Sequence, residues 1–145
     1  MKRWFSNGNL TKQQIFRLLA QREPFLFVDY AIENRVGESV VAAKQLREDD
    51  VPFFRHKQLE FMGQAGCLLV KQCPEFSEKF PVFVGMEEVR WEVEILDPGC
   101  TLYCRANFKG EPRERFGVVE TIAWKHSNGR RRVFCSGELW FSFIQ

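Results

Sequence analysis

The sequence lacks the features that mark several common classes of protein. The start, MKRWFSNGN, has no apolar run of signal-peptide length, and no stretch approaches the roughly 18 apolar residues of a membrane-spanning helix. We therefore expect a cytoplasmic protein without a membrane span. The net charge is only +2, so the chain also lacks the strong basic excess that is typical of a general nucleic-acid binder.

Metal-binding and disulfide patterns are absent as well. The five cysteines have no paired spacing, which is expected of reduced thiols in a cytosol. Cys100 and Cys104 would share one face of a strand, but no second Cys/His pair completes a zinc set. We expect neither a metal nor a cofactor.

Hydrophobic and aromatic residues are plentiful. The chain of 145 residues is 45% hydrophobic and includes fifteen Phe, four Trp and two Tyr. Its length suits one domain, and its composition is that of a globular protein. A core rich in Phe can line a pocket for an acyl chain or can simply fill space, and packing is the commoner reason.

The first third of the chain predicts a short helix and a hairpin. Thr11 is suited to cap a helix over about 11–20 whose apolar residues lie on one face. The run FLFVDYAI (25–32) predicts a buried strand. A turn at 36–38 then leads to SVVAAKQL (39–46), the expected hairpin partner.

A longer helix is expected in the middle of the chain. After a polar loop over 48–52, apolar residues recur at three- and four-residue steps over about 57–72, and Pro74 stops the pattern. Gly63 and Gly66 weaken a helix but let neighbouring elements approach closely. They predict a helix that is packed tightly on several sides.

The rest of the chain predicts antiparallel strands. Turn signals separate four apolar runs, and Asn128-Gly129 is a strong hairpin signal; the runs cover 80–95, 101–108, 116–126 and 133–144. One main helix, with a hairpin before it and strands after it, predicts an α+β domain. In such a domain an antiparallel sheet wraps around the helix.

Three blocks in the chain resemble, in order, motifs of the 3-hydroxyacyl-(acyl-carrier-protein) dehydratases of the FabA/FabZ type. PFLFVDY (24–30) is similar to a strand motif near the start of that family. PFFRH (52–56) and LEFMGQAG (59–66) resemble its F-F-x-G-H-F-P loop and its helix motif. FVGMEEVRWEVEILDPG (83–99) resembles its F-x-G-I block, and GELWFSF (137–143) fits its last hairpin.

The resemblance covers about residues 20–143 and implies one hot-dog domain over 1–145. In that fold a sheet wraps around one long helix and two copies pair as a dimer. The family is a group of lyases of fatty-acid biosynthesis that eliminate water from 3-hydroxyacyl thioesters. The implied partners are therefore an acyl-carrier-protein or coenzyme A thioester and a second subunit, in a homodimer or a mixed dimer with a related chain.

The resemblance also assigns candidate site residues. His56 matches the catalytic base and Glu60 the acid on the helix. The matches for substrate binding are Gln64, Gly85, Phe83 and Phe54. A neutral imidazole is a competent base near pH 7, and a carboxyl in an apolar tunnel can hold the proton that it must give.

The loop between the two catalytic candidates departs from the family. Arg55 stands where the family has Gly, and three residues separate His56 from Glu60 where the family has about a dozen. If the helix begins near His56, the two side chains lie on one face and would form a local pair. Four functions stay open: a dehydratase, a non-catalytic acyl-thioester binding subunit, a thioesterase that uses Glu60, and an interaction domain without a ligand.

Basic residues cluster at Arg113 and Arg115 and again at 130–132. Such runs are usually solvated turns, but they can also dock an acidic partner.

Overall fold

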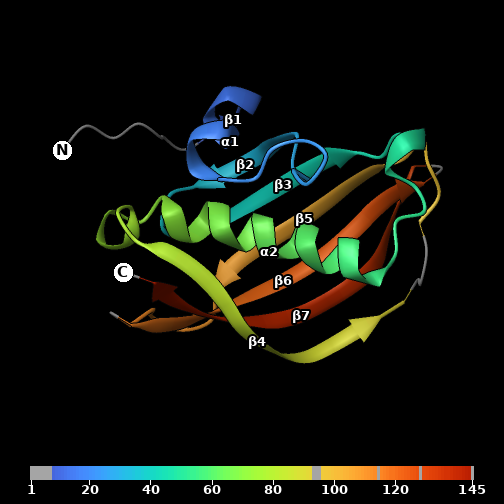
Figure 1. Ribbon diagram of the computed structural model, residues 1–145. Helices are drawn as coiled ribbons and strands as arrows, with labels where there is room; N and C mark the ends of the chain where they lie inside the picture. Colours follow the sequence, from blue (N-terminus) through green and yellow to red (C-terminus); the bar gives the residue numbers. More distant parts are fainter. Residues whose placement is uncertain (1–7, 93–95, 114, 128, 145) are drawn as a thin grey trace.

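The computed structural model describes residues 8–92, 96–113, 115–127 and 129–144. These residues form two α-helices, two short 3-10 helices and seven strands, and Figure 1 shows their arrangement. In chain order they are β1 (Gly8–Leu10), α1 (Lys12–Leu18), β2 (Tyr30–Arg35), β3 (Ser39–Gln45), η1 (Glu48–Asp50), α2 (Arg55–Lys71), η2 (Pro74–Phe76), β4 (Phe80–Trp91), β5 (Thr101–Phe108), β6 (Phe116–Ser127) and β7 (Arg130–Ile144).

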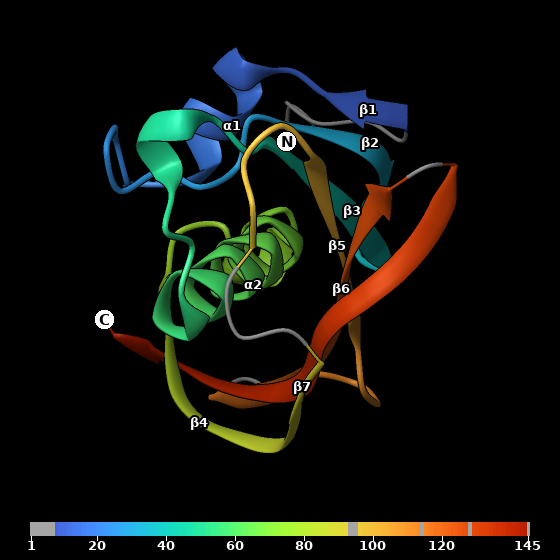
Figure 2. The same ribbon diagram turned by 90° about the vertical axis from the view of Figure 1, so that its right-hand side faces the viewer.

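The strands form one antiparallel sheet in the order β1-β2-β3-β5-β6-β7-β4. The sheet curves around α2, which lies on its concave side, and Figure 2 shows this arrangement along the axis of the helix. The predicted α+β architecture, with a sheet wrapped around one main helix, is therefore confirmed. β1 and β4 are the two edges of the sheet.

The start of α2 and the β6–β7 hairpin lie at the same end of the molecule (Figure 1). The guanidinium of Arg55, the first residue of α2, lies 5.2 Å from the ring centroid of Trp91 at the end of β4. Trp91 pairs with Cys135 of β7, three residues from Arg132 in the hairpin. The start of α2, the end of β4 and the beginning of β7 thus meet at one end of the molecule.

Gly63 and Gly66 of α2 make room for the ring of Phe83 on β4. A Cβ at Gly66 would lie 2.9 Å from Cζ of Phe83, and one at Gly63 would lie 3.5 Å from Cδ2 of that ring. The expectation of tight packing around the two glycines is confirmed. Phe83 joins the core between the helix and the edge strand.

The helix expected over 57–72 is α2 (Arg55–Lys71), which begins two residues earlier and ends one residue earlier than predicted. Thr11 caps α1 as predicted, through a capping box with Gln14, although α1 ends at Leu18. The polar loop before α2 contains the 3-10 helix η1. Part of the predicted strand 80–95 lies outside the described residues, because 93–95 are not among them.

The prediction of a buried strand over 25–32 is wrong for its first half. β2 begins only at Tyr30, and the side chain of Phe25 is 70% exposed. The reason is the pairing of the backbone: the carbonyl of Phe25 and the N–H of Phe27 bond to the side chain of Gln64 instead of to a strand. The apolar run predicts a strand, but Phe25 and Phe27 form these backbone hydrogen bonds with a side chain of α2.

Candidate functional site

One stripe of α2 is only partly covered by the neighbouring elements. It consists of Glu60, which is exposed, and of the partly exposed Gly63, Cys67 and Lys71. These residues recur at three- and four-residue steps, so they lie along one side of the helix. We call them the open stripe of α2. The Phe25–Phe27 segment lies along one flank, where Gln64 binds it, and Phe83 of β4 lies along the other.

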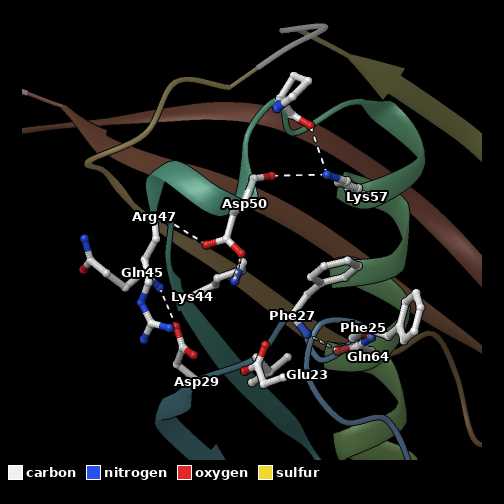
Figure 3. Close-up of polar contacts among 12 residues, drawn as sticks. Glu23, Phe25, Phe27, Asp29, Lys44, Gln45, Arg47, Asp50, Lys57 and Gln64 are labelled. Atoms are coloured by element: carbon white, nitrogen blue, oxygen red, sulfur yellow. Dashed lines mark hydrogen bonds and ion pairs between the residues drawn. The ribbon is translucent and has the colours of Figure 1, made fainter.

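The side chain of Gln64 joins three parts of this site. Its Nε2 donates to the carbonyl of Phe25 at 2.8 Å and to Oε1 of Glu60 at 2.9 Å. Its Oε1 accepts the N–H of Phe27 at 2.8 Å. Figure 3 shows the Gln64 amide facing the Phe25–Phe27 segment. Both amide donors are used, so the orientation of this buried side chain is determined.

One carboxylate oxygen of Glu60 accepts a hydrogen bond from the described residues, and the other accepts none. Oε1 accepts the hydrogen bond from Gln64, whereas Oε2 accepts none from any residue that the structure describes. The carboxylate is thus oriented by the protein but accessible to a ligand. A positioned carboxylate of this kind can give or take a proton in a reaction.

His56 lies one turn before Glu60, in the first turn of α2. Its ring is exposed and stacks on the ring of Phe54, with 5.9 Å between the centroids and 25° between the planes. Neither a hydrogen bond nor an ion pair joins the described side chains of His56 and Glu60. The helix does begin beside His56, but the local pair that this spacing suggested is not made.

The start of α2 keeps free backbone donors. Phe54 occupies the N-cap position and supplies no side-chain cap. Its carbonyl accepts the N–H groups of both Lys57 and Gln58. Within the described part of the chain, the N–H groups of Arg55 and His56 have no acceptor. Unused N–H groups at a helix start are suited to stabilise negative charge on a ligand oxygen.

The short loop before α2 is fixed by charged groups. Nζ of Lys44 lies 3.3 Å from Oδ1 of Asp50, and the N–H of Arg47 donates to Oδ2 of that residue at 2.8 Å. Nζ of Lys57 donates to the carbonyls of Asp50 and Pro52 at 3.3 and 3.2 Å, as Figure 3 shows. The loop is short, but these contacts give it one conformation.

Three predicted site residues remain: Phe54, Phe83 and Gly85. Phe54 is 40% exposed at the start of the helix, and Phe83 is half-buried against Gly63 beside the open stripe. Gly85 pairs with Trp140 on the exposed edge of the sheet, and a Cβ there would meet no atom within 4 Å. The structure thus brings Phe83 close to Glu60 along the helix and leaves Gly85 at the rim.

Cys67 lies on the open stripe but is a poor nucleophile. Burial raises the pKa of its thiol to about 12, so the thiol stays protonated at neutral pH. No group of three or more His, Cys, Asp or Glu side chains among the described residues could hold a metal ion.

Sequence reasoning did not find the main-chain groups of Phe25 and Phe27 or the contacts of Lys44 and Lys57. Two signals pointed to them. Gln64 is a polar residue on an otherwise apolar helix face, and such a residue needs partners when it is buried. Lys44 follows the core residues Val40 and Ala42 at two-residue steps and so lies on the same inward face of its strand, where its charge had to meet a carboxylate.

No family model matches the chain. Three solved structures are similar to it over most of its length. The dehydratase heterocomplex ApeI:P from Xenorhabdus doucetiae is 19% identical with a TM-score of 0.72, over 90% of this chain and 91% of that chain. A protein of Streptococcus mutans bound to acetyl coenzyme A is 12% identical with a TM-score of 0.66, over 87% and 95%. A hypothetical thioesterase of Streptococcus pneumoniae with coenzyme A is 10% identical with a TM-score of 0.61, over 77% and 82%.

These similarities establish that the chain has the hot-dog fold. At such low identities they define the fold and leave the reaction open, because the similar proteins include both a dehydratase and thioesterases. They do not identify the dehydratase family that the motifs resemble. None of the helices in the described parts of the chain is long and apolar enough to cross a membrane.

Proposed function

We propose that the chain binds an acyl thioester along the open stripe of α2 and eliminates water from its 3-hydroxyacyl chain. The observation that carries this proposal is the Glu60 carboxylate, which Gln64 orients and which lies one turn from free N–H groups at the helix start. The similarity to a dehydratase complex over nine-tenths of the chain supports it. Such an activity belongs to fatty-acid biosynthesis or to a related pathway that builds acyl chains.

Each group has a task in this reaction. The thioester oxygen accepts hydrogen bonds from the N–H groups of Arg55 and His56, which stabilise the enolate charge. The neutral imidazole of His56 removes the proton next to the thioester carbonyl. Oε2 of Glu60 gives a proton to the hydroxyl on the next carbon, the C–O bond breaks, and water leaves. The products are an enoyl thioester, an ionised Glu60 and a protonated His56.

A second subunit would complete the site. His56 and Glu60 lie one turn apart on the same helix and do not contact each other, so one copy does not place them on opposite sides of a substrate. The edge strand β4 has no neighbour on its outer side, and three large apolar side chains on it are at least half exposed: Phe80, Val84 and Met86. We include in the proposal a dimer that pairs through β4, with a second copy or a related chain.

A thioesterase is the second candidate, because Glu60 alone of the two catalytic candidates is oriented by the protein. In that reaction Oε2 of Glu60 takes a proton from a water molecule. The resulting hydroxide attacks the thioester carbonyl, the C–S bond breaks, and Glu60 returns its proton to the leaving sulfur, so that the products are a carboxylic acid and a thiol. His56 has no task in it.

The test uses a purified 3-hydroxyacyl thioester of medium chain length, with enoyl absorbance and free thiol followed together. Enoyl product that is lost in both His56→Ala and Glu60→Gln is the expected result. Thiol release that depends on Glu60 and survives His56→Ala would replace the dehydratase by the thioesterase. Binding without either product would leave a non-catalytic binding subunit. Glu38→Gln, an exposed carboxylate in the turn between β2 and β3, is the matched control.

A further inference from the structure

The β6–β7 hairpin carries a dense group of positive charges. Lys125 pairs with Arg132 across the two strands, and Arg130 and Arg131 complete the group. We call these four residues the hairpin cations. The three arginines are exposed, and Lys125 is partly exposed. The sequence from Thr121 to Gly137 contains no Asp or Glu, so the charge has no acidic neighbour within the hairpin.

The hairpin cations are not neutralised elsewhere in the fold. Several basic side chains outside the hairpin do have an acidic partner, and each of these pairs with a carboxylate: Lys12, Lys44, Arg105 and Lys109. Between residues that the structure describes, no ion pair involves a hairpin cation. Four charges that do not cancel create a local positive potential, although the whole chain is nearly neutral.

The group is also held in place. The guanidinium of Arg131 lies 3.8 Å from the ring centroid of Trp124, and Trp124 stacks on Tyr103 with centroids 5.7 Å apart. Trp124 is only 5% exposed, so Arg131 rests on a buried platform. Side chains that are already ordered lose less entropy when they bind a partner.

The hairpin lies close to the candidate site. Arg55 of α2 stacks on Trp91, and Trp91 pairs with Cys135, which is three residues from Arg132 along β7. At a rise of about 3.3 Å per strand residue, this separation along the strand is about 10 Å. A partner on the hairpin therefore reaches the start of α2 without crossing the molecule.

We propose that the hairpin cations are the docking surface for an acidic protein that carries the acyl thioester and presents it to the start of α2. The identity of the cargo rests on the function proposed above. A nucleic acid fits this chain poorly, because a net charge of +2 lacks the strong basic excess of a general nucleic-acid binder and Arg131 covers the Trp124 ring. A lipid surface fits poorly too, because none of the large exposed apolar side chains among the described residues lies between Thr121 and Gly137, the part of the hairpin that carries the cations.

The experiment measures the affinity of the protein for a purified holo acyl-carrier protein at two salt concentrations. The Arg130→Glu/Arg132→Glu variant reverses two exposed charges and leaves Arg131 on its aromatic platform. Its affinity should fall about tenfold or more, and the salt dependence of binding should become weaker. The matched control is Arg35→Glu/Arg113→Glu, which reverses two exposed charges at the opposite end of the sheet and should bind within about twofold of the parent. Thermal unfolding checks that both variants fold.

Several results would overturn the proposal. They are carrier affinity that is unchanged in the hairpin variant, the absence of carrier binding by the parent, and hairpin-dependent binding of single-stranded DNA or anionic vesicles in place of the carrier. A coenzyme A thioester of the same acyl chain separates this inference from the proposed function. Turnover of that thioester without hairpin-dependent carrier binding overturns the docking surface alone. Hairpin-dependent carrier binding without turnover of either thioester supports the surface and overturns the dehydratase.

Discussion

Gln64 and Glu60 lie one turn apart on α2, and Nε2 of Gln64 donates a 2.9 Å hydrogen bond to Oε1 of Glu60. The same amide binds the carbonyl of Phe25 and the N–H of Phe27. One side chain therefore couples the position of the segment before β2 to the orientation of the exposed carboxylate. A change in Gln64 acts on both at once.

The first prediction concerns Gln64→Leu. The substitution leaves the carbonyl of Phe25 and the N–H of Phe27 without their partner and frees the carboxylate of Glu60. The two unsatisfied groups cost about 1–3 kcal/mol each, so the free energy of unfolding should fall by about 2–6 kcal/mol. Thioester turnover should fall further than the fraction of folded protein, measured by steady-state kinetics at a temperature where the variant stays folded.

Lys12→Met is the control for that prediction. Lys12 holds the same segment, through the carbonyl of Val28 at 3.3 Å and Oδ1 of Asp29 at 3.0 Å, but does not contact Glu60. It should lower stability and leave kcat near that of the parent. An equal loss of kcat in both variants would mean that the segment itself, and not the orientation of Glu60, matters for turnover.

The second prediction separates the two glycines of α2. Alanine is favoured over glycine in a helix by about 1 kcal/mol. At Gly63 the new Cβ makes an ordinary 3.5 Å contact with Phe83, so Gly63→Ala should stabilise the protein by up to about that amount. At Gly66 the Cβ would lie 2.9 Å from the ring, so Gly66→Ala should lose the gain or destabilise. Urea denaturation measures both, and equal effects would contradict the packing.

The third prediction tests the pair of Lys44 and Asp50. Lys44 is only 3% exposed, so Asp50→Asn leaves a buried charge without its carboxylate. The free energy of unfolding should fall by about 3–5 kcal/mol. Lys44→Met in the same chain should restore most of it, because the unpaired charge is gone. If the double variant is as unstable as Asp50→Asn alone, the cost arises from the lost contact with the N–H of Arg47.

The fourth prediction concerns the free edge strand. A lysine at Val84 or Met86 places a charge among the exposed apolar side chains of β4, which the proposed dimer would bury. Val84→Lys and Met86→Lys should therefore shift the mass measured by light scattering toward the monomer. Ile32→Lys changes a 46% exposed side chain on β2 and should leave the mass unchanged. A parent that is already monomeric at high concentration would rule out the homodimer.

The fifth prediction follows from Cys67, whose pKa is raised by burial from 9.0 to about 12. Between pH 9 and about 12 the thiol of the unfolded chain loses its proton while that of the folded chain keeps it. The contribution of Cys67 to the free energy of unfolding is therefore unchanged below pH 9 and becomes increasingly unfavourable to folding as the pH rises above 9. At pH 10.5 the thiol should account for a loss of about 2 kcal/mol. Urea denaturation of the parent and of Cys67→Ala at pH 8 and pH 10.5 measures this, and an equal pH dependence in the two proteins would contradict it.

Much of the fold could be predicted because its signals are local. The three- and four-residue spacing of apolar side chains marked α2 to within two residues at each end, and the runs over 101–108 and 116–126 are the strands β5 and β6. The glycines of the turns at 36–38 and 97–99 have positive φ, as such turns require. The short strand β1 was missed, because three residues carry too little pattern.

The site could be predicted only in part. The motif blocks named Glu60 and Gln64, and the structure brings these two together. The suggested contact between His56 and Glu60 does not form, since the ring of His56 stacks on Phe54 instead. Four-residue spacing makes a contact on one helix face geometrically feasible, but the competing partners of each side chain decide whether it forms.

The amino-acid sequence alone determined the type of most elements and the approximate bounds of α2, β5 and β6, since these depend on neighbours a few positions apart. The tertiary structure decided which strand was left as a free edge, where the hairpin cations came to lie, and how the segment before β2 was bonded. Phe25 and Phe27 meet Gln64 across 39 and 37 positions of the chain. A hydrogen bond between a side chain and the backbone over that separation depends on the order of the strands and on the position of the helix, which no local pattern specifies.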